Sequence, residues 1–268
     1  MKKSRRHALG QHYLANRSVL RKIVEVIAPS RNETLVEIGA GKGILTKALA
    51  EKAAVVVAVE KDERLIPYLR ESAPENVRIV HADVLTLDFG KMLDDLGLSS
   101  ARAAGNLPYS VSTPFLFKFL DSKSIFTEGF FLIQKEVAER IAARPGSKKY
   151  APLSIFIQND FEVRIEFSVS PGSFAPPPKV QSSLLSLRKR SQPLHNEVSS
   201  EEFRSFVKTS FAQRRKKLMN NLTAWKHRAG IEEAFVECGL DRDIRAEDLS
   251  PGDFVILFRA LKITRKGE

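Results

Sequence analysis

The fold is set by the stretch Thr34-Leu35-Val36-Glu37-Ile38-Gly39-Ala40-Gly41-Lys42-Gly43. A short, mostly apolar run leads into a glycine-rich loop, and the segment Ile44–Lys52 that follows is typical of a helix. Strand-like and helix-like segments then alternate along the chain, which predicts an α/β fold with a largely parallel sheet covered on both faces. The further strands are expected at Val55–Val59, Val77–Val80, Ala101–Gly105 and Gly129–Ile133.

The pattern changes after Lys149. The segments Phe161–Val169 and Val180–Leu187 are expected to form a hairpin, because no crossover helix fits directly after the first. Polar residues 191–200 indicate a linker, and helical patterns then continue to the end, the first of them capped by Ser199. We therefore expect two domains, a sheet domain over residues 1–190 and a small all-helical domain over residues 191–268.

The composition indicates an anionic partner. The 268 residues carry a formal net charge of +11, which favours nucleic acid over a membrane surface. One cysteine, Cys238, excludes an internal disulfide framework and fits a reducing compartment. The basic N-terminus is not followed by an apolar run, and the most apolar stretch, Ala53–Val59, is too short to cross a bilayer. We expect a cytoplasmic, monomeric protein with no membrane partner.

The tetrapeptide Asn106-Leu107-Pro108-Tyr109 follows an apolar strand and precedes a helical segment. This order places it at the carboxyl end of a strand, where open α/β sheets bind ligands. Pro108 restricts its own backbone and that of Leu107, so the turn should be stiff. It can aim the amide oxygen of Asn106 and a neighbouring carbonyl at one point beside the ring of Tyr109. Such a turn suits a base with an exocyclic amine.

Acidic residues follow the second and third strands. Glu60 is placed to accept hydrogen bonds from both ribose hydroxyls of a nucleoside, and Asp83 can accept one from an adenine amine. The loop Gly39–Gly43 lets a ligand approach the backbone, although it matches neither the phosphate loop nor the dinucleotide fingerprint. Because these strand ends face one crevice, we predict a nucleoside-type cofactor.

Seven motifs together resemble one enzyme family. The loop Gly39–Gly43, Glu60, Asp83 and Asn106–Tyr109 follow the order of S-adenosylmethionine-dependent adenine-N6 methyltransferases. The resemblance runs from Gly10 to Leu261. Three other motifs narrow it to the ribosomal RNA adenine dimethyltransferases of the kasugamycin-resistance type, which act on the small subunit: Gly10-Gln11-His12-Tyr13-Leu14, Phe174-Ala175-Pro176-Pro177-Pro178-Lys179-Val180-Gln181-Ser182 and Phe211-Ala212-Gln213-Arg214-Arg215-Lys216-Lys217-Leu218.

The resemblance implies a fold and a cofactor site. The fold is a Rossmann-like methyltransferase sheet, and the cofactor is S-adenosylmethionine. Its methionine part would lie against the glycine loop, its ribose against Glu60 and its adenine against Asp83. Ala40 and His12 depart from the family, which often has proline and asparagine there, but neither change removes a group that the chemistry needs. The implied cofactor-binding residues are Gln11, His12, Leu14, Gly39, Gly41, Glu60, Asp83 and Asn106.

The resemblance also implies how the target base is held. The adenine would lie between Tyr109 and Phe174, while Asn106 and the carbonyl of Leu107 hold its amine, with Pro108 completing the turn. Two hydrogen bonds of this kind would stabilise the positive charge that develops on the nitrogen. We expect no metal, since the five histidines show no ligand spacing.

The run Arg214-Arg215-Lys216-Lys217 is expected to bind RNA phosphates. The implied partner is small-subunit ribosomal RNA or the assembling small subunit. Three alternatives are a large-subunit adenine methylase of the macrolide-resistance kind, a DNA adenine methylase, and a non-catalytic ribosome-assembly or transcription factor on the same scaffold. The run through Asn220-Asn221-Leu222 favours the small-subunit enzyme, and the intact cofactor residues argue against loss of catalysis.

Overall fold

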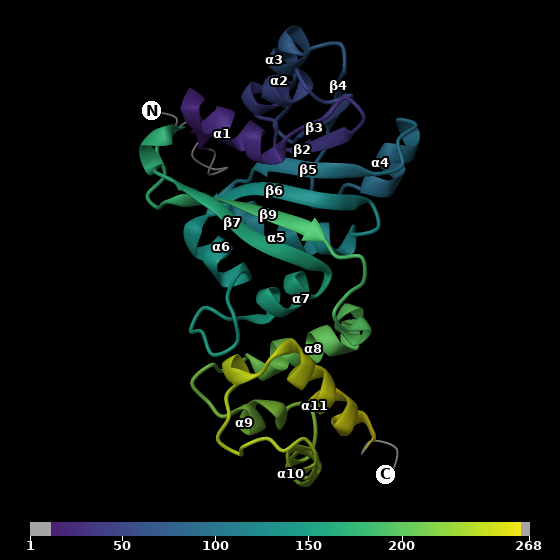
Figure 1. The fold of residues 1–268 in the computed structure, drawn as a ribbon, viewed down its shortest axis with the longest axis vertical. Coiled ribbons are helices and arrows are strands. Elements are labelled where there is room, and N and C mark those ends of the chain that lie inside the picture. The colour runs from purple at the N-terminus through teal and green to yellow at the C-terminus, as the bar shows by residue number, and fades with distance from the viewer. Residues whose placement is uncertain (1–11, 264–268) are drawn as a thin grey trace. The chain divides into compact units, whose positions relative to one another are not determined.

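The computed structural model describes residues 12–263 (Figure 1). Contacts between residues divide the chain into two units. The first comprises Met1–Ala138 and Glu162–Lys189, and the second comprises Glu139–Phe161 and Arg190–Glu268. The boundary expected after residue 190 lies within one residue of Arg190, where the last segment of the second unit begins.

The segment Glu139–Phe161, which the sequence had assigned to the first domain, is part of the second unit. Hydrogen bonds to the start of the C-terminal region account for this. Asn159 Oδ1 accepts a hydrogen bond from the backbone N–H of His195 at 2.8 Å, and Arg190 N–H donates to the carbonyl of Asp160 at 2.9 Å. Asn159 and His195 are 36 positions apart in the chain, so no local pattern in the sequence predicts their contact.

The first unit is built on a mixed sheet. Its strands are β2 (Thr34–Ile38), β3 (Val55–Glu60), β4 (Val77–His81), β5 (Ala101–Asn106), β6 (Phe126–Gln134), β7 (Phe161–Val169) and β9 (Ser182–Lys189). Within the described residues this sheet has seven strands in the order β4-β3-β2-β5-β6-β9-β7. The strands β2 to β6 pair in parallel, and β6 pairs antiparallel with β9. The expected α/β architecture is confirmed.

The expected hairpin is also present, with β7 beside β9 at one edge of the sheet. Ser168 Oγ lies 3.2 Å from Ser183 Oγ, and Ser186 Oγ donates to the Glu166 carboxylate. Residue numbers fall from Ser168 to Glu166 on β7 while they rise from Ser183 to Ser186 on β9. The two strands are therefore antiparallel.

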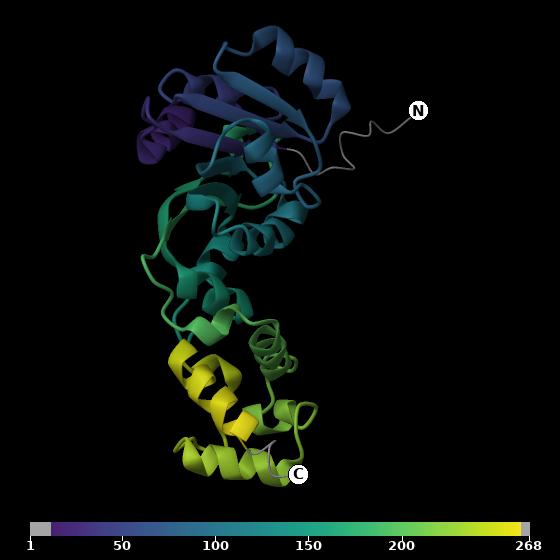
Figure 2. The same ribbon diagram turned by 90° about the vertical axis from the view of Figure 1, so that its right-hand side faces the viewer.

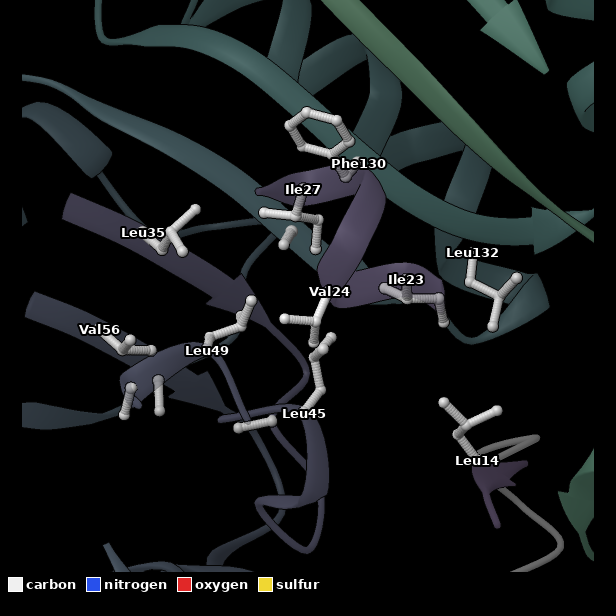
Figure 3. Packing of buried hydrophobic residues seen from close by; sticks show 14 of the residues in the cluster. Leu14, Ile23, Val24, Ile27, Leu35, Leu45, Leu49, Val56, Phe130 and Leu132 are labelled. Carbon is white, nitrogen blue, oxygen red and sulfur yellow. The ribbon is translucent and has the colours of Figure 1, made fainter. Parts of the chain in front are cut away.

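Helices α1 (Arg17–Ile27) and α2 (Ile44–Ala50) pack on one face of the sheet. Ile23, Val24 and Ile27 point from α1 toward Leu45 and Leu49 of α2 and toward the sheet (Figure 3). Asn16 caps α1, as expected, because its Oδ1 accepts from the N–H groups two and three residues on. The sheet contributes the buried residues Leu35, Val56, Phe130 and Leu132 to the same cluster.

Helices α4 (Phe89–Asp95) and α5 (Tyr109–Asp121) supply phenylalanines to a second cluster. The ring of Phe131 in β6 lies 5.3 Å from that of Phe115 and 5.1 Å from that of Phe119, both in α5. Successive residues of a strand point to opposite faces, so Phe130 joins the first cluster and Phe131 the second. The sheet is therefore buried on both faces, as its parallel strands require.

The second unit is helical. Its helices are α7 (Pro152–Asp160), α8 (Glu201–Ser210), α9 (Leu218–Leu222), α10 (Arg228–Glu237) and α11 (Pro251–Ile263), and the last four gather at the C-terminal end of the chain (Figure 2). Phe206 of α8 lies 6.2 Å from Phe254 and 5.4 Å from Phe258 of α11, ring centre to ring centre. The expected cap at Ser199 is wrong by one residue, because the side chain of Ser200 accepts from the N–H of Phe203.

Gly105 is predicted to be indispensable to the packing of β5 on β2. A Cβ atom at this position would lie 2.5 Å from the carbonyl oxygen of Ile38, and a strand backbone cannot easily give way. Gly105→Ala should lower the free energy of unfolding by about 1–3 kcal/mol, measured by urea denaturation.

Gly172→Ala is the matched control, since a Cβ there has no atom within 4 Å. It should change stability by no more than about 0.5 kcal/mol. An equally small effect of Gly105→Ala would contradict the close approach of the two strands.

Candidate active site

A cavity of about 330 Å³ lies at the carboxyl ends of the parallel strands. The strands β2, β3 and β5 end at Ile38, Glu60 and Asn106, and all three residues line it. Gln11 lies outside the described residues. The cavity brings together the other residues that the sequence had singled out for catalysis or cofactor binding in the first unit: His12, Leu14, Gly39, Gly41, Glu60, Asp83, Asn106, Leu107, Pro108, Tyr109 and Phe174.

The glycine loop turns sharply out of β2. Gly39, Gly41 and Gly43 have φ angles of 74°, 59° and 76°, in the left-handed region that favours glycine. At Gly41 there is a second restriction, because a Cβ atom would lie 3.1 Å from the ring of Tyr13. The loop therefore needs glycine both for its conformation and for its contact with the N-terminal segment.

Glu60 holds this loop in place. One carboxylate oxygen accepts the N–H of Gly41 at 2.8 Å, and the other accepts the N–H of Asp62 at 2.8 Å. The side chain is only 4% exposed, so it lies deep in the wall of the cavity. A carboxylate oxygen has more than one acceptor site, so each can still accept from a ligand hydroxyl. The expected ribose contact is compatible with this geometry.

Glu37 is an additional ionisable group that the sequence reasoning did not assign to the site. It lines the cavity, is 2% exposed, and its Oε2 has no hydrogen-bond partner among the described residues. Burial raises the pKa of its carboxyl group to about 8, and the charge of Glu60 adds to the increase. The signal was present in the sequence, since Glu37 is the charged residue within an otherwise apolar strand.

Asp83 lines the cavity but already has partners. Its Oδ2 lies 2.6 Å from the ammonium group of Lys61, and its Oδ1 accepts the N–H of Leu85 at 3.0 Å. The hydrogen bond from Lys61, followed by that from Leu85, lowers the pKa of the carboxyl group. An adenine amine bound here would share the carboxylate with Lys61.

The hydrogen-bond partner of Asn106 fixes the orientation of its side-chain amide. Its Nδ2 donates to the carbonyl oxygen of His12 at 2.7 Å, and a carbonyl oxygen can only accept. Oδ1, which has no hydrogen-bond partner among the described residues, is therefore left to accept from a ligand. The carbonyl of Leu107 is also without a partner in this part of the chain, because only the N–H of Leu107 bonds to β6. Both residues line the cavity and are adjacent in the turn.

Two aromatic side chains line the cavity from different segments. Tyr109 begins α5, and its hydroxyl lies 2.8 Å from Ser182 Oγ, while burial raises its pKa. Phe174 belongs to β8 (Phe174–Ala175), which pairs antiparallel with β1 (Tyr13–Leu14). His12 joins these segments, since its Nδ1 donates to the carbonyl of Pro176 at 2.8 Å and its ring lies 5.6 Å from that of Tyr109.

In the basic run Arg214–Lys217, the first and last residues are bound within the second unit. Arg214 donates to the carbonyls of Lys148 and Tyr150, at 2.6 and 3.0 Å, and to the Glu247 carboxylate. Lys217 forms an ion pair with Asp243.

Arg215 and Lys216 are exposed, and their side chains have no partner among residues 12–263. The run forms a turn between α8 and α9 rather than a face of a helix. Only Arg215 and Lys216 are therefore wholly available to an anionic partner.

Residues 12–263 contain neither a metal-binding cluster nor a membrane-spanning helix. No group of three or more His, Cys, Asp or Glu side chains within residues 12–263 is placed to hold a metal ion. None of the helices in that range is long and apolar enough to cross a membrane.

Two solved structures share this fold over nearly the whole chain. A dimethyladenosine transferase from Plasmodium falciparum aligns with a TM-score of 0.78 and 25% identity, covering 96% of this chain and 98% of that chain. The 23S rRNA methyltransferase ErmE aligns with a TM-score of 0.70 and 26% identity, covering 93% of this chain and 99% of that chain. The fold is that of a methyltransferase with a helical C-terminal part.

Sequence comparison identifies the family. The model of the ribosomal RNA adenine dimethylase family matches residues 2–262. The ribosomal RNA small subunit methyltransferase A of Geobacter sulfurreducens is 43% identical over 261 residues, covering 96% of this chain and 95% of the relative. That of Shouchella clausii is 44% identical over 266 residues, covering 96% and 90%. The chain belongs to the ribosomal RNA adenine dimethylase family, which confirms the resemblance seen in its motifs.

Glu37→Gln is predicted to stabilise the protein at alkaline pH. Between the ordinary pKa of 4.5 and the raised value of about 8, the folded state keeps a proton that the unfolded state releases. The free energy of unfolding of the wild type should therefore fall as the pH rises through this window, on the order of a few kcal/mol, and stay low above it.

The free energy of unfolding of Glu37→Gln should not fall in this window. Measured by urea denaturation, its difference from the wild type should therefore grow between about pH 5 and about pH 8.5. Glu25→Gln, at an exposed position on α1, is the control and should follow the wild type. The same pH dependence in all three proteins would show that Glu37 is not held neutral in the fold.

Proposed function

We propose that this protein transfers methyl groups from S-adenosylmethionine to the N6 amine of adenines in small-subunit ribosomal RNA, giving N6,N6-dimethyladenosine. One observation carries the proposal: Asn106 and Leu107 line the cavity, and Asn106 Oδ1 and the Leu107 carbonyl accept no hydrogen bond from residues 12–263. An exocyclic amine with two hydrogens is the group that this pair fits. Membership of the ribosomal RNA adenine dimethylase family supports the same substrate class.

The residues of the cavity suit S-adenosylmethionine. Glu60 retains acceptor sites for ribose hydroxyls, the left-handed glycine loop exposes backbone beside it, and Asp83 offers its carboxylate to the adenine ring. When bound, the cofactor supplies a methyl group on a sulfonium, which makes that methyl a ready electrophile. The acidic lining formed by Glu60 and Asp83 favours this positive charge over the neutral product.

The acceptors at the turn activate the amine. The lone pair of an adenine amine is delocalised into the ring, so the nitrogen is a poor nucleophile. Hydrogen bonds to Asn106 Oδ1 and to the Leu107 carbonyl favour a pyramidal nitrogen and stabilise its developing positive charge. Because the turn is fixed by Pro108 and by the bond to His12, these acceptors need no reorganisation during the reaction.

The two aromatic rings receive the base. An adenine must leave its stack to reach the cavity, and stacking between Tyr109 and Phe174 offsets part of that cost, by about 1–3 kcal/mol per base. The bond from Tyr109 to Ser182 and the pairing of Phe174 with Leu14 orient the rings. The nitrogen releases one proton as it gains the first methyl, and its remaining hydrogen can bond to one of the two acceptors during a second transfer.

The choice of the small subunit rests on the relatives. Those at 43% and 44% identity are named for the small subunit, whereas the structural neighbour named for 23S rRNA is 26% identical. We propose that residues 1–190 bind the cofactor and that residues 191–268 contact RNA in the assembling subunit. The protein would act as a cytoplasmic monomer.

Asn106→Ala should slow methyl transfer, because it removes the Oδ1 acceptor together with the Nδ2 bond to His12. Losing the acceptor aimed at the amine raises the barrier by about 2–4 kcal/mol, which corresponds to a rate roughly 30- to 1000-fold lower. The measurement is mass spectrometry of RNA nucleosides after incubation with S-adenosylmethionine and under-methylated small subunits, from which the wild type should give dimethyladenosine.

Asn76→Ala is the matched control. Asn76 also donates its amide to backbone carbonyls, those of Ala50 and Ala53, but it does not line this cavity. The control should keep the wild-type rate. A wild type that makes no dimethyladenosine would refute the function, and an Asn106→Ala variant at the wild-type rate would refute the acceptor.

The exposed pair Arg215 and Lys216 should account for the RNA contact of the basic run. Replacing both by Gln should reduce the slope of log affinity against log salt by between about one and two, because two phosphate contacts are lost. The control Lys52→Gln/Lys91→Gln makes the same change of charge at exposed residues of the first unit. Equal slopes for the two double variants would assign the effect to net charge rather than to this turn.

A further inference from the structure

The charged side chains that line the cavity are mostly acidic. Among residues 12–263, four carry carboxyl groups, namely Glu37, Glu60, Asp62 and Asp83, and two are the lysines Lys42 and Lys61. The Lys61 ammonium is paired with Asp83 at 2.6 Å, and Asp62 is bound by Arg64. Lys42 has no carboxylate partner among residues 12–263, so it is the lysine of this lining that is left to bind an anion.

Lys42 has a defined place in the wall. It lies between Gly41 and Gly43 in the loop that leaves β2, and its Nζ is 5.4 Å from the centre of the Tyr13 ring. An ammonium at this distance is attracted to the face of a tyrosine ring. Tyr13 in turn touches Gly41, so ring, loop and ammonium form one side of the cavity.

We propose that Lys42 binds the α-carboxylate of the amino-acid part of S-adenosylmethionine and makes the site selective for ligands that carry this group. The inference rests on the proposed use of that cofactor. Gly41 donates its N–H to Glu60, the carboxylate proposed to hold the ribose, so Lys42 is one residue away from the ribose contact. The amino-acid arm extends from the ribose through the sulfur, and its carboxylate must then lie near the glycine loop.

The electrostatics of the cavity leave few other places for this carboxylate. Near Glu60 it would be repelled, because this buried carboxylate is bound by two backbone N–H groups and has no cationic partner among residues 12–263. Beside Lys42 it gains a charge-assisted hydrogen bond instead. The sulfonium and the α-ammonium carry the opposite sign and suit the acidic remainder of the lining. Lys42, which has no carboxylate partner among residues 12–263, and the buried Glu60 carboxylate thus match a ligand that carries both a carboxylate and cationic groups.

The test compares two ligands that differ by the carboxylate alone. S-adenosylhomocysteine carries it, and S-adenosyl-3-thiopropylamine keeps the ammonium but lacks the carboxylate. Calorimetry on the full chain would measure both affinities for the wild type, for Lys42→Gln and for Lys47→Gln. Lys47 is an exposed lysine of α2 that does not line the cavity, so it controls for the change in net charge.

Lys42→Gln should lower the affinity for S-adenosylhomocysteine by about five- to tenfold, the scale of one charge-assisted hydrogen bond at an exposed side chain. The affinity for the decarboxylated ligand should stay within about twofold of the wild-type value. Lys47→Gln should change neither. An equal loss of affinity for both ligands, or no loss for either, would overturn the inference. A Lys42→Gln variant that loses affinity only for RNA would also overturn it, since Lys42 would then contact phosphate. A wild type that binds neither ligand would instead refute the cofactor assignment.

Discussion

The hydrogen bond from Asn106 Nδ2 to the carbonyl of His12 is the constraint on which the rest of the site depends. It joins residues 94 positions apart and gives the amide one orientation, in which Oδ1 accepts no hydrogen bond from the described part of the chain and can accept one from a ligand. The same His12 donates its ring N–H to Pro176, in the loop that follows Phe174. The end of β5, the N-terminal segment and the proline loop are thereby fixed to one another. An acceptor for an amine and a face for its ring come from parts of the chain that no local interaction would bring together.

Two electrostatic environments follow from one sequence. The chain as a whole carries a net charge of +11, yet the side chains of Glu37, Glu60, Asp62 and Asp83 line the cavity. Backbone N–H groups hold the Glu60 carboxylate, whereas Lys61 pairs with Asp83 and Arg64 pairs with Asp62. Exposed cations such as Arg215 and Lys216 remain available for a polyanion. A cationic cofactor and an anionic RNA can therefore be attracted to different parts of the same chain.

The fold could be predicted because its signals are local. The strands are apolar runs, Asn16 caps the helix that starts beside it, and Asn106 stands where a strand ends. The features that the sequence did not reveal depend on distant partners. Arg214 is bound by Glu247 and by the 148–150 turn, which no sequence pattern reveals, and Glu139–Phe161 joins the second unit through bonds to residues after 189. The strong shift in the pKa of Glu37 likewise arises from burial, which only the assembled sheet creates.

The central claim is that Asn106 Oδ1 and the Leu107 carbonyl receive the amine of the target adenine. The most direct measurement is a crystal structure of this protein with S-adenosylhomocysteine and a short RNA that presents the adenine. The account predicts N6 within hydrogen-bond distance of both oxygens, the base between Tyr109 and Phe174, and Asn106 Nδ2 still bonded to His12. An adenine bound with its amine away from Asn106, or an amide turned so that Nδ2 faces the base, would contradict it.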